Sequence, residues 1–233
     1  MSESKYRVIT LPGYTPYRKG LALQQAAFHA VSKGEFDGVV FILEHAPVYT
    51  FGASGGEENL LLPKEQLESE GIDLVPIRRG GNITYHGPGQ IVAYPILDLS
   101  KLQKDLHWYV GNLEEAVIKT LGEYDLQGGR KAAYRGAWLE DEKIAAVGVQ
   151  FKRWISLHGL AFNIEVDKSA FGRMNPCGIT EFGICSLADF VNQPSIAKIK
   201  EQLINNLAEV YHIDLIPGEN PWEDVAEVEV IDV

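Results

Sequence analysis

A twelve-residue segment rich in glycine constrains this chain more than any other. Residues 79–90 read Arg-Gly-Gly-Asn-Ile-Thr-Tyr-His-Gly-Pro-Gly-Gln. Four glycines and one proline exclude a regular helix, and they flank a β-capable run, Asn82 to His86, with polar and aromatic side chains. The apolar run Ile91 to Leu97 follows directly, so we expect a ligand-binding loop that is anchored on a buried strand.

The composition predicts one compact globular domain. The chain has 233 residues and 45% hydrophobic content, which is enough for a sizeable core. No run approaches ~20 apolar residues, and the N-terminus lacks the apolar core of a signal peptide. We therefore expect a soluble cytoplasmic protein that does not associate with membranes. The two cysteines, Cys177 and Cys185, are expected to be reduced.

The net charge of −11 argues against nucleic-acid binding, for which a basic domain is typical. Much of this charge comes from residues 219–233, an acidic C-terminal tail that contains no lysine or arginine. The middle of the chain holds basic residues that form either a local patch for an acidic partner or scattered solvated charges. They are Arg78, Arg79, Arg130, Lys131, Arg135, Lys152 and Arg153.

The hydrophobic pattern predicts an α+β domain with a mixed β-sheet flanked by helices. Helices are expected from Tyr17 to Lys33 with Gly34 as its stop, from the cap Asp105 to Leu121, and after Pro194 to Val210. Pro95 within a strand run suggests a bulge or a sheet edge. Strands are expected at 7–11, 38–44, 74–77, 91–97, 136–139, 143–151 and 155–164.

Two residues remote in the sequence are candidates for chemistry. Cys177 lies between Pro176 and Gly178, a setting that presents a thiol at a loop apex, although a free cysteine is more often a small buried hydrophobe. A nucleophilic thiol requires a neighbouring cation or base. Strand alternation places Lys143 on the same face as Ala145, Val147 and Val149, so it points either inward to such a thiol or outward to an acidic neighbour.

His86 and His158 each precede a glycine, and each is either a general base or a hydrogen-bonded core histidine. A zinc site built from these histidines and the two cysteines lacks the usual paired-ligand spacing. No phosphate-binding loop of the Walker type and no dinucleotide fingerprint is present. Cys185 lies among apolar residues and is expected in the core.

The segment 79–90 resembles the signature of the octanoyltransferases of lipoate biosynthesis. Three further segments are similar to motifs of that family: residues 143–148 resemble its lysine strand, 157–163 its second substrate loop and 175–179 its nucleophile loop. An upstream segment, residues 43–52, also fits a sequence pattern of that family. These matches occur in one order with plausible spacing, which makes chance agreement improbable.

The resemblance implies transfer of an octanoyl group from octanoyl-acyl carrier protein to a lysine of apo lipoyl domains, on a fold shared with the biotin and lipoate protein ligases. It implies a catalytic domain over residues 1–218, no cofactor, no metal, and a cytoplasmic monomer. The acceptors would be the lipoyl domains of 2-oxoacid dehydrogenases and the glycine cleavage H protein. An ATP-dependent ligase and a non-catalytic binding module remain as alternatives.

The resemblance also assigns residues. Cys177 matches the acyl-accepting nucleophile, and Lys143 matches the partner that lowers the pKa of that thiol. The expected substrate-binding residues are Arg79, Gly80, Gly81, Asn82, Ile83, Thr84, Tyr85, His86, Ala146, Val147, Gly148, His158, Gly159, Leu160 and Ala161. The arginines at 78, 79, 130 and 135, with Lys131, are expected to dock the acidic protein substrates.

Overall fold

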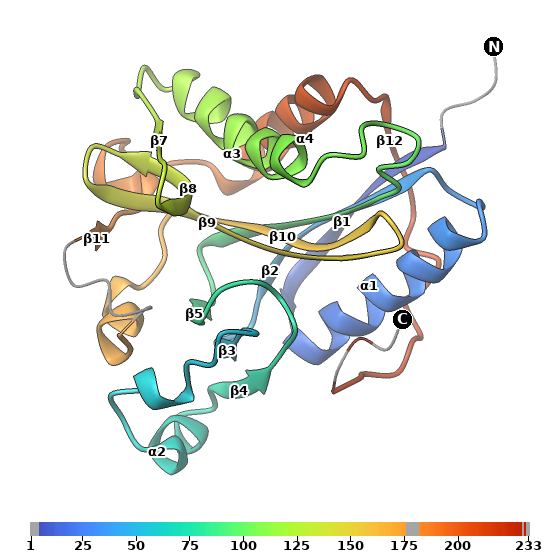
Figure 1. Ribbon diagram of the computed structural model, residues 1–233. Helices are drawn as coiled ribbons and strands as arrows, with labels where there is room; N and C mark the ends of the chain where they lie inside the picture. Colours follow the sequence, from blue (N-terminus) through green and yellow to red (C-terminus); the bar gives the residue numbers. More distant parts are fainter. Residues whose placement is uncertain (1–4, 176–181, 230, 232–233) are drawn as a thin grey trace.

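A large mixed β-sheet forms the centre of the molecule (Figure 1). The computed structural model describes residues 5–175, 182–229 and 231. In this part of the chain the sheet has nine strands in the order β12-β1-β2-β6-β10-β9-β8-β7, with β11 paired to β9. The strands are β1 (Tyr6–Thr15), β2 (Gly38–His45), β6 (Gln90–Leu97), β7 (Gly129–Lys131), β8 (Tyr134–Leu139), β9 (Glu142–Lys152), β10 (Ile155–Asn163), β11 (Gly183–Ile184) and β12 (Leu215–Pro217).

Both strand orientations occur in this sheet. The pairs β12·β1, β1·β2 and β11·β9 are parallel, whereas the ladder from β2 through β6, β10, β9 and β8 to β7 is antiparallel. The prediction of a single α+β domain with a mixed sheet is therefore confirmed.

Helices cover both faces of the sheet (Figure 1). On one face lie α3 (Leu106–Gly122) and α4 (Ile196–Tyr211), which pack with β6, β10 and β9 in a first hydrophobic core. On the other face α1 (Tyr17–Ser32) packs over β1, β2 and β6 in a second core, and Leu21, Ala27, Phe28 and Val31 point inward as predicted.

Local signals in the sequence fix the ends of these helices. The Asp105 carboxylate accepts hydrogen bonds from the backbone amides of His107 and Trp108, so it caps α3 as predicted. Ser195 caps α4 through the amide of Lys198. Gly34, at a φ of 78°, ends α1 because only glycine adopts this left-handed conformation at little cost.

A second, smaller sheet covers the part of the main sheet that α1 leaves open. It has the order β4-β3-β5, with β3 (Val48–Phe51), β4 (Asp73–Pro76) and β5 (Ile83–His86), and it carries α2 (Lys64–Ser69). Short 3-10 turns lie at Glu57–Asn59, Lys168–Arg173 and Leu187–Asp189. This sheet forms a third core with Phe171 and Met174, and β5 belongs to the glycine-rich segment.

Pro95 lies in the interior of the sheet, so the expectation of a sheet edge is wrong. It pairs with Val40 of β2 on one side. On the other side the paired residues of β6 and β10 stop at Ala93 and Leu160, and the Ser156 hydroxyl donates to the Pro95 carbonyl at 2.7 Å. The missing proline N–H is tolerated because side chains replace the backbone ladder there.

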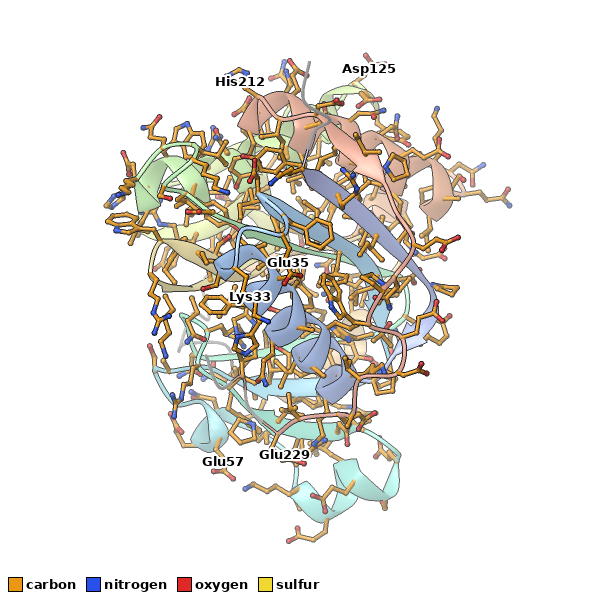
Figure 2. All side chains as sticks on the ribbon, turned by 90° about the vertical axis from the view of Figure 1, so that its right-hand side faces the viewer. Lys33, Glu35, Glu57, Asp125, His212 and Glu229 are labelled. Carbon is orange, nitrogen blue, oxygen red and sulfur yellow. The ribbon has the colours of Figure 1, made fainter. Side chains whose placement is uncertain are left out.

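The acidic segment after Pro217 packs along α1, as Figures 1 and 2 show. We name residues 220–229 together with Ile231 the C-terminal strap. Trp222 lies edge-on to Phe41 at 6.0 Å between ring centroids, and Ile231 is 5% exposed in the second core. The Lys19 ammonium donates to the Val225 carbonyl at 2.6 Å. The strap is thus attached to α1 by apolar and polar contacts.

Candidate active site

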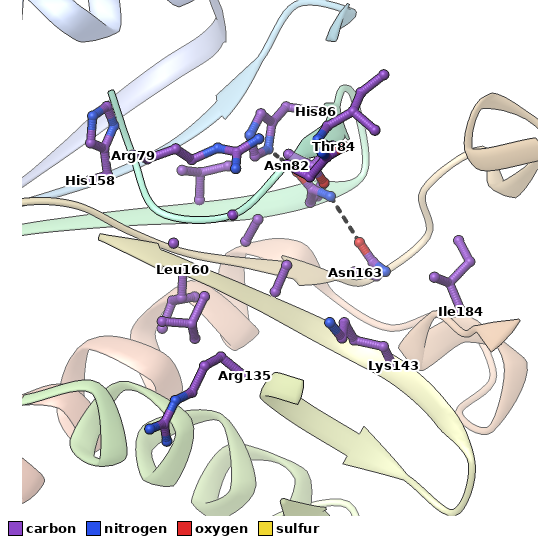
Figure 3. A pocket seen from close by; sticks show the side chains of 18 of the residues that line it. Arg79, Asn82, Thr84, His86, Arg135, Lys143, His158, Leu160, Asn163 and Ile184 are labelled. Atoms are coloured by element: carbon purple, nitrogen blue, oxygen red, sulfur yellow. Dashed lines mark hydrogen bonds between the residues drawn. The ribbon is translucent and has the colours of Figure 1, made fainter. Parts of the chain in front are cut away.

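A cavity of about 170 Å³ lies between the two sheets (Figure 3). One wall is the face of the main sheet formed by β6, β10 and β9, and the opposite wall is the glycine-rich segment with β5. Phe171, Met174, Phe182 and Ile184 also line the cavity. The glycine-rich segment therefore forms a ligand-sized cavity wall that is anchored on the buried strand β6, as its sequence predicts.

The structure brings nearly all the predicted substrate-binding residues together at this cavity. Tyr85 is the exception, because strand alternation directs its ring into the third core, 5.2 Å from Tyr49 and 5.6 Å from Phe171. The predicted residues that line the cavity are Arg79, Gly80, Gly81, Asn82, Ile83, Thr84, His86, Ala146, Val147, Gly148, His158, Gly159, Leu160 and Ala161.

Small residues form the floor of the cavity on the main sheet. Gly148 and Gly159 are paired residues of β9 and β10, and Ala146 and Ala161 form the next pair along. A Cβ at Gly148 would lie 3.1 Å from the Gly80 carbonyl oxygen, and one at Gly159 would lie 2.1 Å from the Ala93 oxygen. A side chain at Gly148 would therefore meet the opposite wall and narrow the slot, whereas Gly159 is required because the backbone of β6 approaches it closely.

Arg79 fixes the glycine-rich segment rather than facing solvent. It is 8% exposed, and its guanidinium donates to the Thr50 carbonyl at 3.0 Å and to the Thr50 hydroxyl at 2.8 Å. A third hydrogen bond goes to the Gly80 carbonyl. The expectation that Arg79 docks a protein partner is therefore wrong, since hydrogen bonds to β3 hold its side chain in the interior.

A chain of hydrogen bonds crosses the cavity from β5 to β10 (Figure 3). The Gln90 amide donates to Asn163 Oδ1 at 2.9 Å, so its carbonyl oxygen faces His86 Nδ1 at 2.8 Å and accepts from it. The Asn163 amide in turn donates to the Cys185 carbonyl. Burial, reinforced by the neighbouring imidazole of His45 and by the charge of Arg79, holds the pKa of His86 well below its usual value. His86 is therefore a neutral imidazole whose Nε2 is the unprotonated nitrogen.

Two further buried histidines lie beside the cavity. His45 donates from Nδ1 to the Thr15 carbonyl at 2.8 Å, and its Nε2 accepts from the Tyr94 hydroxyl at 2.7 Å. Burial lowers the pKa of His45 to about 4. Burial and the charge of Arg79 lower the pKa of His158 to about 3. The inner wall of the cavity is thus aromatic and uncharged apart from Arg79.

His158 has an unusual backbone conformation. Its φ is 59°, in the left-handed region, and its amide donates to Gln24 Oε1 of α1 at 2.7 Å. Its ring lies edge-on to that of Tyr94. The side-chain amide nitrogen of Gln24 and Nδ1 of His158 are buried without a hydrogen-bond partner among the described residues. The side chain of His158 is therefore positioned by α1 and β6 together.

Lys143 lies on the cavity face of β9, but not on the face that alternation predicts. Lys143 pairs with Trp138 and Ala145 pairs with Ala137, so Ile144 is an extra residue in a β-bulge. Ala145 then faces the first core, and Lys143 shares the cavity with Ala146 and Gly148. The Lys143 ammonium lies 4.9 Å from the centre of the Trp138 ring. The bulge therefore directs this amine into the cavity.

The structure describes one of the two cysteines, Cys185. Cys177 lies outside the described residues, but Met174 and Phe182, which flank it in the chain, both line the cavity. Cys185 is fully buried in the first core, as predicted. Burial first, and then the charges of Glu142 and Asp189, raise the pKa of the Cys185 thiol to about 12. Cys185 is therefore unsuited to act as a nucleophile.

Several cavity residues were not among the predicted ones. Gln90 and Asn163 end the two glycine-containing motifs, so their position next to those motifs was the available signal. Tyr94 lies in an apolar strand run and Tyr17 at the start of a helix, where nothing in the pattern separates them from core residues. Trp138 and Arg135 also line the cavity, and Arg135 is exposed.

The predicted basic groups are only partly available to a partner. Arg130 forms ion pairs with Glu114 and Glu115, and Lys131 forms one with Asp141. Arg135 is exposed, and its guanidinium makes no hydrogen bond or ion pair to any described residue. Of the basic residues named for docking, Arg78 and Arg135 are thus the exposed ones without an acidic partner among the described residues, and of these two Arg135 lines the cavity.

Comparison with known proteins identifies the fold and the family. Residues 16–208 match the family described as the lipoyl protein ligase A/B catalytic domain. Two solved structures, a bipartite lipoate protein ligase from Thermoplasma acidophilum and a lipoate-protein ligase A bound with ATP, superpose with a TM-score of 0.75. Each is 18% identical to this chain; the first covers 93% of this chain and 88% of its own, the second 94% and 89%. The predicted ligase-like catalytic fold is confirmed.

Relatives found by sequence similarity identify the family more narrowly than the solved structures do. An octanoyltransferase of Thermoanaerobacter sp. strain X514 is 50% identical over 202 residues, 86% of this chain and 88% of its own. One of Clostridium kluyveri is 46% identical over 87% of each chain. One of Nostoc sp. strain PCC 7120 is 39% identical over 88% of this chain and 91% of its own. The chain therefore belongs to the lipoyl protein ligase A/B catalytic domain family, and within it to the octanoyltransferases.

Among the described residues, no helix is both long enough and apolar enough to cross a membrane.

Proposed function

We propose that this protein transfers an octanoyl group from octanoyl-acyl carrier protein to a lysine of apo lipoyl domains, in the first step of protein lipoylation. The observation that carries this function is the 50% identity to an octanoyltransferase across 86% of the chain. The narrow slot over Gly148 and Gly159 supports it, because an unbranched acyl chain fits where side chains are excluded. The donor and acceptor are the substrates that this activity requires.

The proposed chemistry has two acyl-transfer steps. In the first, the Cys177 thiolate attacks the donor thioester: a new sulfur–carbon bond forms, the donor sulfur–carbon bond breaks, and the carrier thiol leaves with a proton. In the second, the acceptor lysine attacks the acyl-enzyme, forming an amide and releasing Cys177. The second step is downhill because an amide has more resonance stabilisation than a thioester.

Lys143 is proposed to take part in both acyl-transfer steps. As an ammonium it stabilises the Cys177 thiolate, and as an amine it takes the proton that the acceptor lysine must lose. Its position supports this role, since the bulge at Ile144 directs it into the cavity beside Trp138, whose ring lies 5.4 Å from that of Phe182. The residues listed above as lining the cavity are the proposed acyl-binding wall.

Hydrophobic burial gives the site its preference for the acyl chain. Each buried methylene contributes ~0.8 kcal/mol, so a chain shorter by two carbons is bound more than tenfold less tightly. The neutral state of His45, His86 and His158 matters here, because a charged imidazole would attract water into the slot. Among the described residues of its inner wall the charged side chain is Arg79, whose two terminal nitrogens donate to Thr50 of β3 and to Gly80.

The acceptors proposed are the lipoyl domains of 2-oxoacid dehydrogenases and the glycine cleavage H protein, and the protein would act as a cytoplasmic monomer. All proposed site residues lie within residues 1–218, which we take as the catalytic domain. Docking of the acidic carrier would use Arg135, which is exposed at the cavity.

Intact-mass measurement after incubation with octanoyl-acyl carrier protein tests the proposal. The wild-type protein and Cys185→Ser should gain the mass of one octanoyl group, and Cys177→Ser should not. Addition of an apo lipoyl domain should discharge the adduct and octanoylate the domain. A parallel incubation with octanoate and ATP examines the ligase alternative; octanoylation of the domain in that reaction, without any acyl-enzyme, would overturn the transferase.

A further inference from the structure

The cavity is a slot that follows β9 and β10 and has two distinct ends (Figure 3). Lys143, Asn163 and Ile184 lie at one end, where Ile184 pairs with Lys143. His158 lies at the other, paired with Val149. Asn163 and His158 are five positions apart on β10, which is roughly 17 Å of strand. The two ends of the slot are therefore well separated.

An acyl chain that starts at the Lys143 end runs toward His158. An extended eight-carbon chain has about the length of three strand residues, so it ends near Leu160. The next residue along the slot, Gly159, offers no side chain, and the imidazole of His158 follows it. His158 is therefore the first side chain on β10 that a longer acyl chain would meet.

The C-terminal strap contacts His158 from behind. Ile231 of the strap and His158 line the same narrow crevice, together with Leu21 of α1, Ile77, Arg78 and Gln150, and this crevice has no room for a water molecule. Ile231 is 5% exposed and His158 is 3% exposed. Because the crevice is already closed, the His158 ring cannot retreat unless Ile231 or α1 moves.

Polar contacts keep the strap in this position. Arg18 of α1 forms ion pairs with Glu229 of the strap and with Asp73 of β4. The Lys19 ammonium donates to the carbonyl oxygens of Glu223 and Val225, and the Val228 amide donates to the Arg18 carbonyl. Ile231 is thereby fixed relative to α1, the helix whose Gln24 also binds the His158 backbone.

From these contacts we infer that the C-terminal strap sets the acyl chain-length limit of the site, with Ile231 as a positioning residue that holds His158 as the stop. This inference rests on the proposed octanoyl transfer. It gives the acidic segment, which lies beyond the matched residues 16–208, a role in substrate selection.

Competing acyl donors test this role in the full-length protein. The measurement is the ratio of kcat/KM for dodecanoyl- to octanoyl-acyl carrier protein, because four further carbons add about 5 Å and bring the chain end to the His158 ring. Ile231→Ala should raise this ratio about tenfold, the worth of roughly two buried methylenes, by letting His158 withdraw. Ile231→Val should raise it less. Val225→Ala, which removes a similar volume elsewhere on the strap, should leave the ratio unchanged.

A double mutant separates positioning from a general loss of stability. His158→Gly removes the ring while keeping the left-handed backbone that glycine tolerates, and it should raise the ratio at least as much as Ile231→Ala. If Ile231 acts through His158, adding Ile231→Ala to His158→Gly should change the ratio little further.

The outcomes distinguish the two proposals. Absence of octanoyl transfer by the wild-type protein would overturn the proposed function itself. Normal octanoyl transfer with the same chain-length ratio in wild type, Ile231→Val and His158→Gly would overturn the role of the strap. An equal rise in Ile231→Ala and Val225→Ala would also overturn it, since the effect would then report only loosening of the strap.

Discussion

At the scale of single residues, the proposed chemistry uses the amine of Lys143, which a backbone irregularity directs into the cavity. The bulge at Ile144 puts Lys143 beside Trp138 and opposite β5, whereas regular alternation would bury it under α3. A lysine under that helix would lie in an apolar core without a partner, which is costly. Because of the bulge, β9 contributes Ala145 to the first core and Lys143 to the cavity.

Substitutions of Lys143 should separate its two proposed roles. Lys143→Met should lower kcat about 100-fold, because it removes both the charge and the proton acceptor. Lys143→Arg keeps the charge but cannot accept a proton, so acyl-enzyme should still form while its discharge to the lipoyl domain fails. Single-turnover mass spectrometry of each step checks this.

The matched control is Lys198→Met, an exposed lysine on α4, which should retain wild-type rates. A kcat for Lys143→Met within about threefold of wild type would contradict the proposed proton transfer.

The buried histidines should make stability depend on pH. The folded-state pKa of His45 is about 4 and that of His158 about 3, below the ordinary 6.5. Below pH 6.5 the unfolded chain therefore binds protons that the folded chain does not. The free energy of unfolding should fall as the pH is lowered from 6.5 to 4, by about 1.4 kcal/mol per pH unit for each such histidine.

Urea unfolding at pH 6.5, 5.5 and 4.5 measures this slope. His45→Gln should unfold more easily at every pH but with a slope smaller by about 1.4 kcal/mol per unit. Parallel curves for wild type and His45→Gln would show that His45 does not titrate differently in the two states.

At the scale of secondary-structure elements, two helices provide a matched pair of glycines. Gly20 of α1 faces the main sheet, and a Cβ there would lie 2.8 Å from Cε1 of the buried His45. Gly111 of α3 has no atom within 4 Å of such a Cβ. Alanine favours a helix by about 1 kcal/mol over glycine when nothing opposes it.

The two alanine substitutions should therefore have opposite signs. Gly111→Ala should raise the free energy of unfolding by about 0.5–1 kcal/mol. Gly20→Ala should lower it by about 1–3 kcal/mol, because His45 is held by Thr15 and Tyr94 and cannot move aside. Chemical denaturation of both variants checks this, and stabilisation by Gly20→Ala would mean that α1 can shift away from the sheet.

Most elements could be predicted from sequence, and the ones that were missed are short. All seven expected strands and three expected helices occur; most carry several turns or alternations of apolar residues, and the four-residue β4 was recognised from the run 74–77. The strands β3, β7, β11 and β12 and the helix α2 were missed, since segments of two to six residues hold little periodicity. The segment Asn82 to His86, in contrast, was recognised as β-capable and contains β5.

The site was predictable where a motif carried it. The motifs in the glycine-rich segment and in β9 and β10 predicted the residues that form the cavity walls. The bulge at Ile144 and the left-handed backbone of His158 could not be predicted, because a regular alternating pattern carries no sign of either. Tyr17, Tyr94 and Gln24 were missed because their roles arise from tertiary contacts with His86, His45 and His158. The sequence signal for the packing of the strap was Trp222 alone.

At the scale of the whole molecule, the net charge has the opposite sign to the exposed charged residue that lines the cavity. The net charge is −11, yet the exposed cation that lines the cavity, Arg135, makes no ion pair to any described residue. An acidic carrier approaching this protein meets overall repulsion, so local attraction at Arg135 should contribute mainly to encounter and orientation. Its neighbours Arg130 and Lys131 are neutralised by Glu114, Glu115 and Asp141 and should matter less.

Charge reversal tests this arrangement. Arg135→Glu should raise the KM for octanoyl-acyl carrier protein about tenfold at low salt, and the difference from wild type should shrink in 1 M salt, where the Debye length is only ~3 Å. Lys33→Glu makes the same change in net charge at the end of α1 (Figure 2) and should alter the KM little. An equal rise in both variants would assign the effect to net charge, and no rise in either would remove Arg135 from the docking of the donor. Because the carrier rather than the acyl chain is repelled, the ratio of dodecanoyl to octanoyl transfer should stay constant in both variants.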